Sequence, residues 1–139
     1  MPGVAGRRPA DAERAVALGI DGLHVSNHGG RQIDALPASI NILPAIAQEV
    51  GDKATLIADS GVRSGVDVAR AIARGADAAF AGKAFLWSLG ALGKHGPAHL
   101  IDIFQEELSA TLGQLGCASV YDLRTVAIRH RNAYTLKDF

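Results

Sequence analysis

The sequence predicts an α/β fold in which parallel strands alternate with helices. This prediction comes from three short β-like runs, each followed by glycine-containing punctuation and then a helical pattern; the runs are Gly22 to Ser26, Thr55 to Ala58 and Ala78 to Ala81. Parallel strands joined by right-handed crossovers build either an open doubly wound sheet or part of a (β/α)8 barrel. Because three or four strands cannot close a barrel, whose usual length is about 250 residues, we expect an incomplete part of a larger fold.

Helical patterns fill the segments around these runs. The first helix is expected over Pro9 to Leu18, because proline suits the first turn of a helix and Gly19 suits its end. Apolar residues at helical spacing predict three further helices, over Ser39 to Val50, about Val66 to Arg74, and about Pro97 to Leu115.

The chain is interpreted as one partial domain over residues 1–139. Residues 1–116 carry the half-barrel pattern, and residues 117–139 form a helical and polar tail. Phe80, Phe85 and Trp87 are expected to pack in the core or at the end of the barrel. A half-barrel exposes strand edges and an apolar inner face, so we expect self-association or a missing N-terminal half to cover them.

Composition restricts the class of partner. The chain is 48% hydrophobic and its formal net charge is zero, which predicts a globular protein that binds no nucleic acid and no anionic membrane. Cys117 is the only cysteine, which excludes an intrachain disulfide and favours a cytoplasmic location. No apolar run reaches the roughly 20 residues of a transmembrane segment, and the spacing of the histidines predicts no metal site.

The loop after the first predicted strand carries side chains suited to a carboxylate substrate. Its sequence is Ser26-Asn27-His28-Gly29-Gly30-Arg31-Gln32. Histidine exchanges a proton near neutral pH, and arginine holds a carboxylate through two parallel hydrogen bonds. The alternative for His28 is a loop histidine bonded to backbone, and His24 is expected to be a packed or hydrogen-bonded neighbour.

The two later strand-to-helix loops suit a phosphate. Asp59-Ser60-Gly61-Val62-Arg63-Ser64-Gly65 leads into a helix N-terminus, where unpaired amides and the helix dipole attract an anion, and Arg63 adds a positive charge. Gly82 and Lys83 follow the next strand and offer a second cation. Glycine-rich turns often serve backbone geometry alone, and Asp59 suits either a ligand hydroxyl or a turn cap.

These three motifs, with Gly-Lys-Ala-Phe-Leu-Trp at 82–87, resemble the FMN-dependent 2-hydroxy acid dehydrogenase and oxidase family. The resemblance implies the C-terminal half of a (β/α)8 barrel that oxidises an L-2-hydroxy acid such as lactate to the 2-oxo acid, with electrons passing to FMN. It implies that His28 is the base, that Arg31 binds the substrate carboxylate and that Ser26 touches the flavin. The implied FMN contacts further along the chain are Asp59, Ser60, Gly61, Val62, Arg63, Gly82 and Lys83.

The chain departs from the family pattern at three positions. Lys83 stands where arginine is common, Ser60 replaces a usual glycine, and Val4 takes the place of a lysine that faces the flavin. Because this lysine is missing, a second hypothesis is a non-catalytic or self-associating module that binds a phospho-ligand. Other phosphate-binding barrels, such as the type 2 isopentenyl diphosphate isomerase or IMP dehydrogenase groups, do not explain the loop with His28 and Arg31. Oxygen, a quinone or a cytochrome would each suit as electron acceptor.

Overall fold

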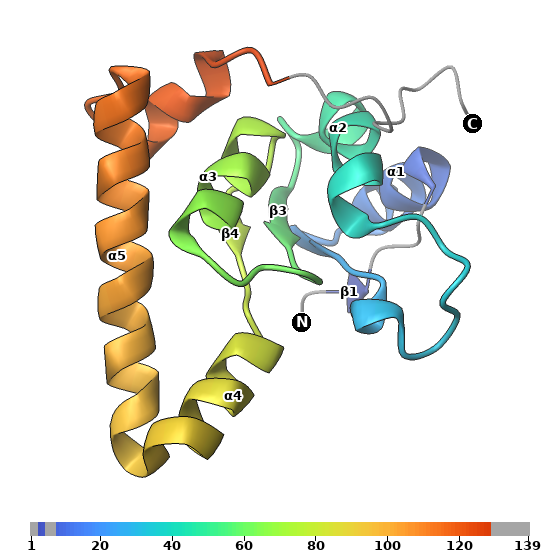
Figure 1. The fold of residues 1–139 in the computed structure, drawn as a ribbon. Coiled ribbons are helices and arrows are strands. Elements are labelled where there is room, and N and C mark those ends of the chain that lie inside the picture. Colours follow the sequence, from blue (N-terminus) through green and yellow to red (C-terminus); the bar gives the residue numbers. More distant parts are fainter. Residues whose placement is uncertain (1–2, 5–7, 129–139) are drawn as a thin grey trace.

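The computed structural model describes residues 3–4 and 8–128, which form an open parallel sheet with helices around it (Figure 1). The sheet has four strands in the order β1-β2-β3-β4, all parallel; they are β1 (Gly3–Val4), β2 (Gly22–Val25), β3 (Thr55–Ala58) and β4 (Ala78–Ala79). The predicted α/β fold is confirmed. Strand order follows chain order without the reversal that defines a doubly wound sheet.

The helices are α1 (Pro9–Ala17), α2 (Ser39–Val50), α3 (Gly65–Ala73), α4 (Lys83–Leu92) and α5 (Gly96–Leu115). Short 3-10 turns lie at η1 (His28–Gly30), η2 (Gly93–His95) and η3 (Val120–Thr125). The four expected helices are confirmed to within two residues at each end. Helix α4 was not predicted, because the residues after Lys83 are almost all apolar and show no helical stripe.

The main core lies on the face of the sheet that α1 and α2 cover, which we call the outer face. Side chains of a strand alternate between faces, and Leu23, Val25 and Leu56 all point to this side, where they are completely or almost completely buried. They pack against apolar side chains of α2, chiefly Ile42, Leu43 and Ile46. The opposite or inner face therefore carries the residues between them, including His24 and Ile57.

A second, smaller cluster joins α3 to α5 and η3. Ala69 and Ile72 of α3 meet Leu123 of η3, which is completely buried, and Leu108 of α5 packs against them. Figure 1 shows α5 standing beside α3, with the following segment turning back over the top of both. The first part of the expected tail is thus packed on α3, and residues 129–139 lie outside the described residues.

Phe80 and Trp87, expected to pack in the core or at the end of the barrel, do not lie in the core of the described residues. Their side chains are 53% and 56% exposed, and Leu86 is 67% exposed, whereas Phe85 is half-buried. The reason is that α4 extends away from the sheet and contacts α5 (Figure 1). On the inner face of the sheet, His24 and Ile57 are likewise only partly buried.

Gly65 allows the close crossing of α3 and α5. A Cβ atom at this position would overlap backbone atoms of Phe104 and Leu108, neither of which can move aside alone. Gly65→Ala is expected to destabilise the protein by about 1–3 kcal/mol through this overlap. Urea denaturation measures the change.

The matched control is Gly113→Ala, which lies in α5 where an added Cβ meets nothing. This change is expected to stabilise the protein by about 0.5–1 kcal/mol, because alanine is the better helix former. Equal denaturation midpoints for the two variants would show that the crossing does not require glycine.

Candidate functional site

The carboxyl ends of β2, β3 and β4 meet at one edge of the sheet, and all three predicted loops start there. The hydrogen-bonded register continues just past the strands, with Asp59 N donating to Val25 O at 3.2 Å and Phe80 N to Ala58 O at 2.8 Å. Parallel pairing therefore brings the predicted site residues to a common rim. We call these segments the base loop (26–31), the β3 loop (59–64) and the β4 loop (80–83).

The base loop is a tight turn that presents His28 and Arg31 to solvent. Ser26 is buried, and its Oγ accepts a hydrogen bond from His28 N at 3.0 Å. His28, Gly29 and Gly30 follow with φ of +56°, +65° and +76°, so the turn is left-handed through three residues. Neither His28 nor Arg31 takes part in an ion pair within the described ranges, which leaves both side chains available to a ligand.

Ser60 connects the β3 loop to the base loop. Its Oγ accepts hydrogen bonds from Asn27 N at 3.2 Å and from Gly29 N at 3.1 Å. Its hydroxyl proton goes to Asp59 Oδ1 at 2.6 Å, and Ser26 Oγ lies 3.5 Å away. One side chain therefore bonds the backbone on both sides of His28.

The β4 loop completes the rim with a cation. Lys83 Nζ donates to Gly29 O at 3.4 Å, so the third loop also reaches the base loop. The Arg63 guanidinium lies 5.3 Å from the ring centre of Trp87 on α4, in the range of a cation–π contact. Two positive side chains thus lie close to the first turns of α4.

Around the start of α3, the amides of Arg63, Gly65 and Asp67 already have side-chain acceptors in the protein. Gly65 N donates to Glu107 Oε2 of α5 at 2.7 Å, and Arg63 N donates to Asp67 Oδ2 at 3.1 Å. Ser64 Oγ caps the helix by accepting from Asp67 N at 3.1 Å. Two carboxylates at this helix start oppose a phosphate there.

The start of α4 offers what α3 lacks. No side chain of the described residues caps Gly82, and the first intrahelical bond runs from Leu86 N to Gly82 O at 3.2 Å. The amides of the first turn point away from the helix without an internal partner, which is the usual arrangement of a helical anion site. The sequence pointed to Gly82 and Lys83, but not to the helix they begin.

On the inner face, Asp59 pairs with the histidine that was expected to be a neighbour of the site. His24 Nε2 lies 3.0 Å from Asp59 Oδ2, a close contact whose alignment is poor for a hydrogen bond. The His24 ring also meets Phe80 edge-on, with ring centres 5.6 Å apart. Asp59 therefore contacts both Ser60 and His24. No backbone amide of the described residues donates to its carboxylate, so it does not cap the turn.

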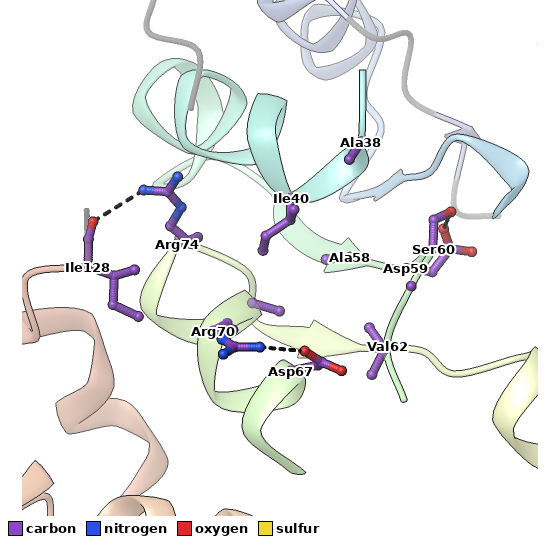
Figure 2. A pocket seen from close by; sticks show the side chains of 12 residues that line it. Ala38, Ile40, Ala58, Asp59, Ser60, Val62, Asp67, Arg70, Arg74 and Ile128 are labelled. Atoms are coloured by element: carbon purple, nitrogen blue, oxygen red, sulfur yellow. Dashed lines mark hydrogen bonds and ion pairs between the residues drawn. The ribbon is translucent and has the colours of Figure 1, made fainter. Parts of the chain in front are cut away.

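A pocket of about 610 Å³ lies behind the β3 loop, between α2 and α3 (Figure 2). Its wall includes Asp59 and Ser60, but none of His28, Arg31 or Lys83 lines it. Arg70 is paired with Asp67 at 2.9 Å. Arg74 donates to Ile128 O at 3.3 Å, and burial lowers the pKa of its guanidinium. This cavity backs the candidate site and does not contain its reactive side chains.

The described residues hold neither a group of metal-ligating side chains nor a membrane-spanning helix. Among residues 3–4 and 8–128, no three histidine, cysteine or acidic side chains are grouped so that they could hold a metal ion. In the same residues, no helix combines the length and apolar character needed to cross a membrane.

Comparison with known proteins places the chain among flavin enzymes. Residues 3–130 match the model of the family described as FMN-dependent dehydrogenase. The L-lactate dehydrogenase of Bartonella tribocorum is 44% identical over 126 residues, which cover 91% of this chain and 33% of that protein. The L-lactate dehydrogenase of Bartonella quintana is 48% identical over 115 residues, which cover 83% and 30%. The chain spans about a third of the length of these curated relatives.

Solved structures agree with the sequence relatives. A mandelate oxidase with (S)-2-phenylpropionate superposes with a TM-score of 0.87 at 37% identity, covering 93% of this chain and 39% of that one. A mandelate oxidase variant with the monooxide FMN adduct gives a TM-score of 0.85 at 38% identity, covering 92% and 40%. Because the family match extends over almost the whole chain, the chain belongs to the FMN-dependent dehydrogenase family.

Proposed function

We propose that this chain is the C-terminal part of a (β/α)8 barrel that oxidises an L-2-hydroxy acid, such as lactate, to the 2-oxo acid with FMN. The observation that carries the proposal is the rim itself. A histidine and an arginine face solvent from one tight turn, and a lysine that bonds the same turn stands at an uncapped helix start. L-lactate dehydrogenases and mandelate oxidases among the relatives support this substrate class.

The phosphate of FMN fits the start of α4. Free first-turn amides donate hydrogen bonds, the helix dipole favours an anion, and Lys83 supplies a positive charge at the first helical residue. Arg63, above Trp87, can add a second charge. Of the other expected cofactor residues, Gly61 and Gly82 are exposed, whereas Val62 is nearly buried.

The chain's own side chains handle the substrate. Arg31 binds the carboxylate through its planar fork, which lysine cannot reproduce. His28 takes a proton from the 2-hydroxy acid, because an imidazole can accept one near neutral pH. FMN, when bound, accepts the two electrons that the substrate loses. The role of Ser26 as a flavin contact rests on the family resemblance, since its hydroxyl already accepts from His28 N and lies 3.5 Å from Ser60 Oγ.

A complete site needs more than the residues described. The inner face and α4 expose Phe80, Leu86 and Trp87, and both sheet edges lack a neighbouring strand in the described residues. A further half-barrel, from the same polypeptide or from a second copy, would cover these surfaces. A cytoplasmic location stays a prediction.

One observation favours a second candidate function, a non-catalytic module that binds FMN or another phospho-ligand. Val4, at the position where the family resemblance implies a lysine, lies on β1 beside His24 in the sheet register. An uncharged residue there leaves the phosphate end of the site intact. An anaerobic addition of L-lactate, glycolate or mandelate distinguishes the two candidate functions. Bound FMN loses its yellow absorption if the protein is catalytic and keeps it if the protein only binds the cofactor.

His28→Gln tests the base. It is expected to lower the rate of FMN reduction by roughly 10²–10⁴-fold, because glutamine cannot accept the proton. FMN affinity should stay within error, since the His28 side chain contacts no part of the proposed phosphate site. Stopped-flow absorbance measures the reduction step, and His99→Gln on the exposed side of α5 is the control. An unchanged rate in His28→Gln would exclude His28 as the base.

Lys83→Gln tests the phosphate site. Loss of a charged hydrogen bond worth about 1.5–3 kcal/mol is expected to weaken FMN binding by at least about tenfold. Quenching of flavin fluorescence gives the dissociation constant. Lys94→Gln, at the far end of α4, should bind FMN as the unaltered protein does. Equal affinities in both variants would place the phosphate elsewhere.

A further inference from the structure

We infer that Ser60 is a positioning residue whose hydroxyl clamps the base loop, and that this hydroxyl does not bond the cofactor. The inference rests on the proposed function for its catalytic meaning, but its structural part stands on the contacts of Ser60 alone. It departs from the expectation that Ser60 lines FMN together with its neighbours in the β3 loop.

The hydrogen-bonding capacity of the Ser60 hydroxyl is already filled. A serine hydroxyl has one proton to donate and two lone pairs to accept with. The proton goes to Asp59 Oδ1 at 2.6 Å, and the lone pairs accept from Asn27 N at 3.2 Å and Gly29 N at 3.1 Å. A cofactor oxygen could bond the Ser60 hydroxyl only by displacing one of these partners.

The backbone conformation of Ser60 points the same way. Its φ of +72° lies in the left-handed region, which costs free energy for any residue with a Cβ and which glycine adopts freely. The next residue, Gly61, has a φ of +95° and is a glycine, as the turn favours. Ser60 has a positive φ although it is not a glycine. A serine in the strained position is compensated by the three hydrogen bonds of its hydroxyl.

The clamp fixes the loop that carries the base. Amides on both sides of His28 bond the Ser60 oxygen, while His28 N bonds Ser26 and Gly29 O accepts from Lys83. The backbone of residues 27–29 is thus held at three successive amides. The backbone position from which the His28 imidazole extends is therefore fixed before substrate binds, which preorganises the base.

Ser60→Gly and Ser60→Ala in the full chain test the clamp. Ser60→Gly also relieves the strained backbone, so its folding is not at risk from the turn. We expect the Asn27 and Gly29 amides to exchange with deuterium at least about tenfold faster in both variants, whereas amides within α3 are unchanged. Residue-resolved exchange, measured by NMR without cofactor or substrate, is the readout, and Ser109→Ala on the exposed side of α5 is the control.

Kinetics of the FMN-loaded protein give the second readout. We expect kcat to fall about tenfold in both variants because His28 loses its position, while KM for L-lactate and the dissociation constant of FMN change less than about twofold. Unchanged amide exchange with weakened FMN binding would overturn the inference and make Ser60 a cofactor ligand. If the unaltered protein does not oxidise 2-hydroxy acids, the proposed function fails, and the exchange experiment still decides the clamp.

Discussion

The parallel register of β2, β3 and β4 is the constraint on which the rest of the structure depends. It aligns Val25 with Ala58 and Ala58 with Ala79, so the chain leaves all three strands at one level. The loops that follow are short enough to bond one another directly, through Ser60 and Lys83. The base loop, with His28 and Arg31, and Lys83 of the β4 loop are thus adjacent in the fold although Gly29 and Lys83 lie 54 positions apart in the sequence.

Two helix starts lie at this rim, and they differ in the groups that surround them. The α3 start is closed by carboxylates, with Glu107 on Gly65 N and Asp67 on Arg63 N, so it is stabilised within the protein and opposes an added anion. No side chain of the described residues caps the α4 start, which has a lysine at its first residue. Free amides and a positive side chain favour an anion, so we expect the phosphate at α4 and not at α3.

The sequence predicted the parts of this arrangement that depend on local pattern. Alternation of apolar residues and glycine punctuation located β2, β3 and four helices, and the motif residues located the three loops. What it could not supply were contacts between distant residues. Glu107 reaches Gly65 across 42 positions, and the bonds of Ser60 cross more than 30. Helix α4 was not predicted because the residues after Lys83 are almost all apolar and have no helical periodicity. The exposure of its side chains depends on how neighbouring elements pack, which a local pattern does not show.

The most direct measurement of the central claim is a crystal structure of the protein with FMN. We expect the phosphate to accept hydrogen bonds from the amides that begin α4 and from Lys83, while Gly65 N keeps its bond to Glu107. A phosphate bound at the start of α3, with Glu107 displaced from Gly65, would contradict it.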